Sequence, residues 1–127
     1  MTLADYFEKT KGVGVLSTAD KGGRVNAAIY GRPHFVDDQT IVFIAADRLT
    51  HANLQSNKSA AYLFKEDGSY QGKRLYLTMT HEEKNSSLIE KLRRRKSGEV
   101  DNNDQAESRF LIYFNVDQVL PLIGDGK

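Results

Sequence analysis

The stretch from position 45 to position 53 carries the side chains best suited to chemistry. It reads Ala-Ala-Asp-Arg-Leu-Thr-His-Ala-Asn and connects a predicted strand to a predicted helix. A guanidinium, a hydroxyl and the N–H groups of a helix start can together bind a phosphate dianion without a metal. Arg48 would clamp the phosphate, and Thr50 would donate from its hydroxyl or its backbone. In the alternative interpretation, Thr50 only caps the helix and Arg48 pairs with Asp47 or with solvent.

The remaining reactive residues give little support to other chemistries. The chain has no cysteine, which excludes thiol catalysis, disulfides and cysteine zinc sites. Its histidines, His34, His51 and His81, have no metal-ligand spacing, so no metal site is predicted. No serine lies in a Gly-x-Ser-x-Gly sequence. Chemistry therefore depends on oxygen and nitrogen groups or on a bound cofactor, and no catalytic residue is assigned.

Length, composition and charge indicate a single soluble domain and argue against a membrane protein or a nucleic-acid-binding protein. The 127 residues are 39% hydrophobic and 28% charged, with a net charge of +1, which is typical of one soluble domain spanning 1–127. The longest strictly apolar run, 41–46, is far shorter than the ~20 residues of a membrane helix. The basic run 91–96 is interpreted as the end of a helix, where positive charge is favourable. We therefore expect a cytoplasmic protein with no membrane and no nucleic-acid partner.

Alternating apolar residues and turn signals predict the elements that position the candidate site. The expected strands are 12–19, 24–36, 40–46, 59–65, 73–80 and 108–116. Helices are expected at about 3–11, at 50–55, and from a capping box at Thr80 and Glu83 to a stop at Gly98. The pattern predicts a mainly β, antiparallel fold with short helices. Closure into a small barrel would remove exposed edges, and a sandwich also fits.

The order of these segments resembles a known family. The segments that carry the resemblance are Gly14 to Thr18, the Gly22-Gly23 turn, Val25 to Ile29, Ile41 to Ile44, Arg48 to Leu54 and Ser59 to Leu63. Together they resemble the FMN-binding split barrels related to pyridoxamine 5'-phosphate oxidase. The resemblance implies a six-stranded antiparallel split β-barrel with short flanking helices. It also implies FMN as cofactor and a homodimer with the flavin at the subunit interface.

The resemblance also implies which residues form the cofactor site. Arg48 and Thr50 would hold the FMN phosphate, with Asn53 as a weaker member. The strands beside the flavin ring would contribute Asn26, Ala27, Ala28, Ile44 and Ala45. Small side chains there would let backbone groups reach the ring. Tyr30, Arg32 and His34 continue one of these strands and are candidates for contacting a substrate or a reduced nicotinamide.

These residues lead to a functional hypothesis with open alternatives. The first is an FMN-dependent oxidoreductase acting on a small planar or aromatic molecule, with the protein positioning the ring and tuning its potential. The second is a flavin carrier or electron-transfer protein without catalysis. The third is a split barrel that has lost FMN and serves as a binding or structural dimer. A deazaflavin in place of FMN also fits the resemblance.

Overall fold

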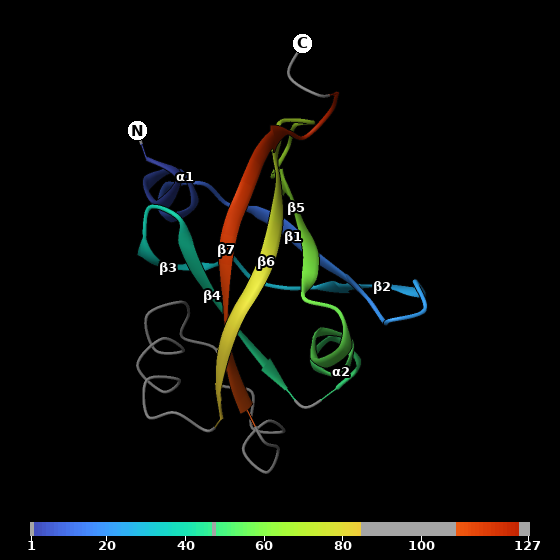
Figure 1. Cartoon of the computed structure of the whole chain (residues 1–127). Coiled ribbons are helices and arrows are strands. Elements are labelled where there is room, and N and C mark those ends of the chain that lie inside the picture. The colour runs from blue at the N-terminus through green and yellow to red at the C-terminus, as the bar shows by residue number, and fades with distance from the viewer. Residues whose placement is uncertain (1, 47, 85–108, 125–127) are drawn as a thin grey trace.

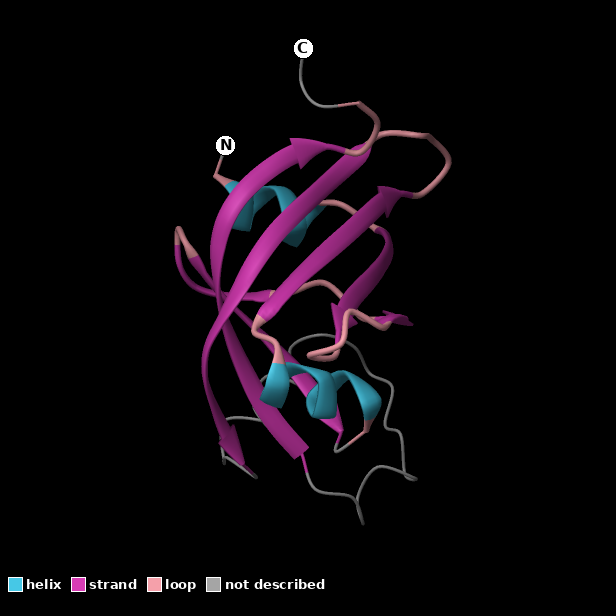
Figure 2. Cartoon of the chain, turned by 45° about the vertical axis from the view of Figure 1, so that its right-hand side comes forward, coloured by secondary structure: helices cyan, strands magenta, loops and turns pink. Residues whose placement is uncertain are grey.

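Seven antiparallel strands form one sheet in the computed structural model, which describes residues 2–46, 48–84 and 109–124. The elements are α1 (Leu3–Lys9), β1 (Gly12–Ala19), β2 (Val25–Ile29), β3 (His34–Asp37), β4 (Thr40–Ala46), α2 (Leu49–Ser56), β5 (Ser59–Glu66), β6 (Gly72–Lys84) and β7 (Arg109–Pro121). Their order across the sheet is β2-β1-β5-β6-β7-β4-β3 (Figure 1). The sheet curls strongly but leaves β2 and β3 as separate edges (Figure 2).

The edge elements differ from the sequence-based expectation. The predicted strand 24–36 is two strands, β2 and β3, so the described sheet has seven strands and not six. The break at 30–33 contains Pro33, which has no N–H for a ladder hydrogen bond. Because the two halves lie at opposite edges of the sheet, this connection crosses the mouth of the curled sheet.

The predicted capping box at Thr80 and Glu83 is wrong. Strand β6 continues through both residues to Lys84, and β7 pairs along this extension, for instance His81 with Tyr113. Cross-strand hydrogen bonds therefore outcompete the local helix signal. The rest of the predicted helix, to Gly98, lies outside the described residues.

The two described helices are short. Thr2 and Asp5 form a capping box at the start of α1, where Thr2 Oγ1 accepts from the Asp5 N–H at 3.1 Å. The buried ring of Phe7 fixes α1 against the core and lies edge-on to Phe64, with ring centroids 5.0 Å apart. In the part of the chain that the structure describes, no helix is long and apolar enough to cross a membrane.

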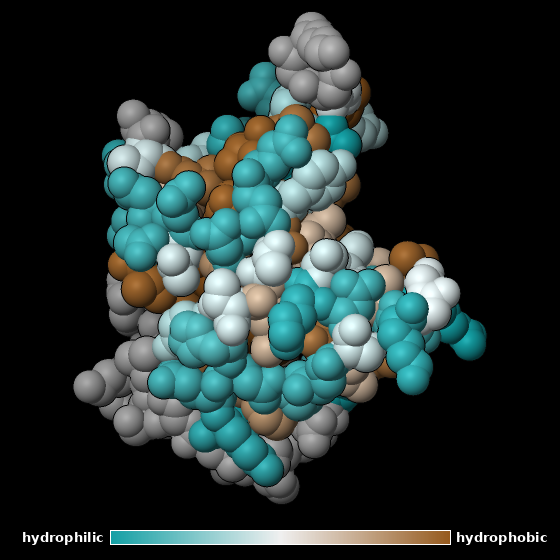
Figure 3. Space-filling view, in the orientation of Figure 1, coloured by the Kyte–Doolittle hydropathy of each residue, from teal (hydrophilic) through white to brown (hydrophobic). Residues whose placement is uncertain are grey.

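The core lies on the inner face of the curled sheet. Its buried side chains include Leu16, Phe43, Tyr62, Phe64, Leu75, Leu77, Ile112 and Phe114. Strand β4 is buried on both faces, as its apolar run predicts, because Val42 packs on the outer face with Leu111. Polar and charged side chains cover much of the molecular surface seen from the side of α2 (Figure 3). The inner core thus fixes the curl of the sheet.

A buried phenol ties the core to the connection between β2 and β3. The hydroxyl of Tyr62 donates toward the carbonyl oxygens of Gly31 and Tyr30, at 3.0 and 3.2 Å. The ring occupies space beside Gly14, where a Cβ atom would overlap it. Tyr62 is fully buried, so both carbonyls are held from the interior of the protein. The backbone that carries Tyr30 is therefore fixed by a core residue.

We predict that Gly14→Ala destabilises the protein by about 1–3 kcal/mol, the usual cost of overpacking a filled core. The added methyl group must displace the Tyr62 ring. Urea unfolding measures the change. Gly22→Ala is the matched control, because its Cβ would meet only Asp20 Oδ1 at 3.4 Å in an exposed turn. Equal stability of the two variants would show that the ring moves aside freely.

Candidate functional site

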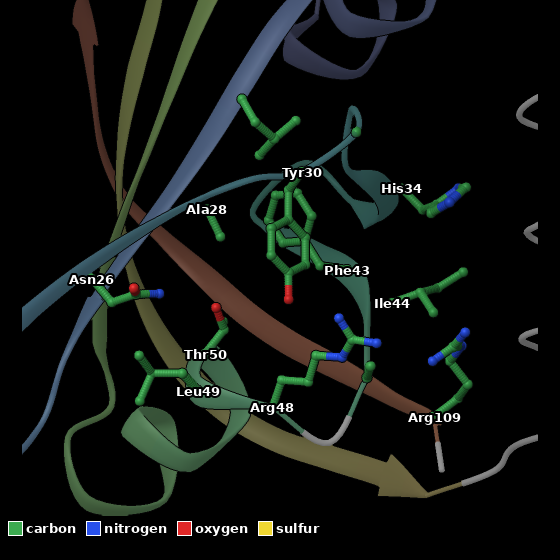
Figure 4. Close-up of a pocket in the computed structure, with 13 residues that line it drawn as sticks. Asn26, Ala28, Tyr30, His34, Phe43, Ile44, Arg48, Leu49, Thr50 and Arg109 are labelled. Carbon is green, nitrogen blue, oxygen red and sulfur yellow. The ribbon is translucent and has the colours of Figure 1, made fainter. Parts of the chain in front are cut away.

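A cavity of about 540 Å³ opens between β2, β4 and the start of α2. Its lining comes from six places in the chain: β2, the connection 30–33, the first residue of β3, β4, the start of α2 and the first residue of β7 (Figure 4). The labelled lining residues are Asn26, Ala28, Tyr30, His34, Phe43, Ile44, Arg48, Leu49, Thr50 and Arg109. The cavity is therefore assembled by contacts between segments far apart in the sequence.

Three polar side chains converge at one corner of this cavity. Thr50, in the first turn of α2, is buried and lines the cavity together with Arg48 and Tyr30. Burial raises the pKa of Tyr30, and the Thr50 hydrogen bond and the Arg48 charge partly oppose that rise. Figure 4 shows all three side chains directed into the cavity. A cation, a hydroxyl and a phenol that remains protonated at neutral pH thus face the same space.

Thr50 does not cap α2, in contrast to the alternative interpretation of the sequence. The N-cap is Arg48, with extended backbone, and its side chain makes no capping hydrogen bond. Thr50 lies within the helix rather than at its N-cap, and its side chain is directed into the cavity. Asp47, the partner expected for Arg48 in that alternative, lies outside the described residues. The N-terminus of α2 lies at the cavity, because Arg48 and Thr50 are both in the lining. The N–H groups of a first helical turn have no acceptor within the helix and point out of its N-terminus.

The walls beside this corner come from alternating residues of β2 and β4. Asn26, Ala28 and Tyr30 alternate along β2 and its extension and face the cavity, as the period of a strand requires. Ile44 and Ala46 do the same on β4. Phe43 lies behind Tyr30, with ring centroids 5.7 Å apart in an edge-to-face arrangement. The cavity thus lies between the two strands, with side chains of β2 on one side and of β4 on the other.

Seven of the sequence-predicted residues line the cavity, namely Asn26, Ala28, Tyr30, His34, Ile44, Arg48 and Thr50. The other four lie elsewhere. Ala27 is exposed on the opposite face of β2, and Ala45 is buried in the core, because adjacent strand residues point to opposite faces.

Asn53 and Arg32 make structural contacts. Asn53 is buried and donates from Nδ2 to Thr18 Oγ1 at 3.1 Å, which joins α2 to β1. Arg32 donates to the carbonyl oxygens of Phe7 and Thr10 at 3.0 and 3.2 Å, at the end of α1. The structure therefore places neither side chain in the lining of the cavity.

Sequence reasoning missed six lining residues, namely Ile29, Gly31, Phe43, Ala46, Leu49 and Arg109. Arg109 had a usable signal, because Phe110, Ile112 and Phe114 alternate inward along β7 and leave Arg109 facing outward. Its pairing partner, Ala46, is set by the long-range register of β4 with β7. That register cannot be deduced from local pattern, so the position of Arg109 beside the cavity could not be predicted.

Helix α2 is held to the sheet by a polar and aromatic cluster. The His51 ring stacks on Phe110 with centroids 3.7 Å apart, and its Nε2 lies 2.9 Å from Glu82 Oε2. Gln55 Nε2 donates to Glu82 Oε1 at 2.7 Å. These contacts join α2 to β6 and β7. They fix the orientation of the helix start that faces the cavity.

Solved structures share this arrangement of strands. An FMN-binding protein from Syntrophomonas wolfei matches with a TM-score of 0.77 and 20% identity, over 95% of this chain and 84% of the other. An F420 reductase matches with a TM-score of 0.75 and 14% identity, over 94% and 97%. The heme storage protein HutZ of Vibrio cholerae matches with a TM-score of 0.70 and 18% identity, over the whole of both chains.

These comparisons establish the fold. Structures described as putative pyridoxamine 5'-phosphate oxidases match as well, so the chain has the split-barrel fold of the proteins related to that oxidase. No known family profile matches the sequence, and no curated protein matches it. The predicted split barrel is confirmed, with seven described strands in a sheet whose two edges, β2 and β3, do not pair.

We predict that Glu82→Gln alters the pH dependence of stability. Burial raises the pKa of Glu82, but hydrogen bonds from His51 and Gln55 outweigh this effect and lower it below its usual value. Its charged form therefore stabilises the fold above the unfolded-state pKa of about 4.3. That contribution is lost as pH falls through the folded-state pKa.

Urea unfolding between about pH 6 and pH 3 measures this effect, because the interval spans the ordinary carboxyl pKa. The stability advantage of the native protein over Glu82→Gln should shrink as pH falls. Glu8→Gln removes one negative charge at an exposed position. Its free energy of unfolding should change with pH in the same way as that of the native protein. Parallel profiles for both variants would contradict a stabilising role of the Glu82 carboxylate.

Proposed function

We propose that the cavity binds FMN and that the protein is an FMN-dependent oxidoreductase of a small molecule. The convergence of Arg48, Thr50 and Tyr30 at the start of α2 carries this proposal. In the proposed complex these three groups hold the phosphate. The isoalloxazine ring lies along Ala28 and Ile44. The shared fold of an FMN-binding protein supports the choice of cofactor.

The donor set fits this cofactor. A guanidinium, two hydroxyl donors and a helix N-terminus match the oxygens of a phosphate dianion. None of the described lining residues is acidic, so no carboxylate among them repels the phosphate. The cavity of about 540 Å³ lies within the usual range for small-molecule sites, ~300–1,000 Å³. Ala28 and Ala46 leave room for the ring to approach the backbone.

The residues of the chain have binding and orienting tasks in this proposal. Bound FMN supplies the hydride or electron transfer, so no protein nucleophile is needed. Arg48 fixes the phosphate end, and Tyr30, whose pKa is raised by burial, donates a hydrogen bond at neutral pH. Tyr62 and Gly14 position Tyr30 through the backbone. Phe43, which packs edge-to-face on Tyr30, adds an apolar surface to the site.

The alternatives differ in spectrum and reactivity. An F420 reductase and a heme storage protein share the fold, so a deazaflavin or a heme is the competing ligand. The absorbance spectrum of the purified protein distinguishes the two, because a heme has a Soret band and a flavin does not. A competition titration with FMN and the deazaflavin shows which of these two cofactors binds more tightly. Anaerobic bleaching by reduced nicotinamide or by a substrate distinguishes an oxidoreductase from a flavin carrier. A protein that binds no cofactor would be a split barrel that has lost it.

We further propose that a second copy of the chain covers the site. Edge strand β2 presents Val25 and Ile29, which are 78% and 72% exposed, together with Ala27. Isolated exposed apolar residues are ordinary, but this set is contiguous on an unpaired edge strand. Ile29 also lines the cavity. A partner seated on β2 would therefore bury the apolar strip and close the cofactor site together.

We predict that Arg48→Gln weakens FMN binding by about 1.5–3 kcal/mol, the scale of a hydrogen bond to a charged group. Fluorescence titration of cofactor-free protein measures the affinity. Riboflavin is the matched ligand, because it has the same ring and no phosphate, and its affinity should stay unchanged. Arg24→Gln, in the exposed β1–β2 turn, controls for the loss of one positive charge. Equal losses for FMN and riboflavin would move the phosphate away from Arg48.

The dimer proposal has its own test. Light scattering after size-exclusion chromatography should give the mass of two chains for the native protein. The double variant Val25→Glu, Ile29→Glu should give one chain, because the charges would be buried against the partner. Ile123→Glu changes a comparably exposed apolar residue near the other end of the chain and should remain dimeric. A native protein with the mass of one chain would refute the dimer.

A further inference from the structure

A second cationic region lies in the cavity, away from the corner formed by Arg48, Thr50 and Tyr30. Arg109 begins β7 and His34 begins β3, and both side chains line the cavity. Figure 4 shows Arg109, Ile44 and His34 in a row along one side, with Thr50 and Tyr30 on the other. The lining thus carries positive or titratable groups at two separate places.

Sheet register explains this row. Strand β4 lies between β3 and β7, and Arg109 pairs with Ala46 while His34 pairs with Val42. Paired residues in an antiparallel sheet point to the same face, so both side chains project from the outer face of β4. Ile44 lies on that face between the two paired positions. An apolar residue therefore separates a guanidinium from an imidazole.

The chemistry of the row favours an anion with an apolar body. Arg109 is 8% exposed, and a buried guanidinium binds carboxylate or phosphate more strongly than an exposed one. His34 adds an N–H donor. None of the described lining residues is acidic, although the chain as a whole is nearly neutral at +1. The charged side chains of the described lining are thus all positive.

We propose that Arg109 and His34 form a subsite for the carboxylate or phosphate of a second ligand, whose apolar or aromatic part packs on Ile44. This ligand is a substrate separate from the cofactor, and its role as substrate rests on the proposed FMN function. FMN has one phosphate, which the proposed complex holds at Arg48 and Thr50. The guanidinium of Arg109, on the far side of Ile44, therefore has no role in binding that phosphate. The subsite selects anionic substrates over neutral molecules of the same shape.

Benzoate and benzamide test this selection, because they share a ring and differ in charge. Perturbation of the flavin absorbance of FMN-loaded protein should give an affinity for benzoate about tenfold higher than for benzamide, the scale of one charge-assisted hydrogen bond. Arg109→Gln should remove the difference and leave benzamide binding unchanged. Arg109→Lys should keep part of it, because the charge remains and the planar fork is lost.

Controls separate this inference from the proposed cofactor. Arg24→Gln should bind benzoate like the native protein. His34→Gln should weaken benzoate and not benzamide, and it provides a second variant if Arg109→Gln melts at a much lower temperature. Phenyl phosphate shows whether the subsite prefers phosphate to carboxylate. FMN affinity should remain within about twofold in Arg109→Gln, below the effect of a lost charged hydrogen bond.

The two proposals can fail independently. FMN binding without any preference for benzoate would overturn the anion subsite and leave the cofactor proposal intact. A large loss of FMN but not riboflavin affinity in Arg109→Gln would also overturn it, because Arg109 would then bind the cofactor phosphate. If the native protein binds no FMN, amide ¹H–¹⁵N spectra of the cofactor-free protein provide the same comparison. An Arg109-dependent preference for benzoate there would support the subsite while the cofactor proposal fails.

Discussion

The arrangement of the site depends on one buried hydroxyl. Tyr62 reaches from the core to the carbonyl oxygens of Tyr30 and Gly31, in space that exists because position 14 is glycine. The chain between β2 and β3 contains Pro33 and crosses from one edge of the sheet to the other, so the ladder alone does not hold it. The core thereby positions Tyr30 against Thr50. A polar corner of the cavity is built on an interior hydrogen bond.

Much of the fold could be predicted because local pattern and tertiary packing agree. The alternation in β1, β5 and β7 and the apolar run of β4 reflect burial that the sheet provides. The failures occur where long-range pairing prevails. Thr80 and Glu83 have the spacing of a helix cap, but pairing with β7 extends β6 through them. Pro33 divides a strand that alternation alone presents as continuous.

The types of residue that form the site could be predicted from the sequence, but the directions in which their side chains point were harder to predict. Arg48 and Thr50 stand out locally, because a basic and a hydroxyl residue open a helix after a buried strand. Asn53 and Arg32 carry equally suitable groups, yet they bind Thr18 and the end of α1. Their partners lie more than twenty positions away in the sequence, and no local pattern reveals such contacts. Arg109 was missed for the same reason.

The central claim is that a phosphate dianion binds where β4 gives way to α2. A crystal structure of the protein grown with FMN tests it most directly. The account predicts phosphate oxygens within hydrogen-bond distance of the Arg48 guanidinium, the Thr50 hydroxyl and the Tyr30 phenol, with the ring beside Ala28. A phosphate bound anywhere else, or a cavity that remains empty at saturating FMN, would contradict the account.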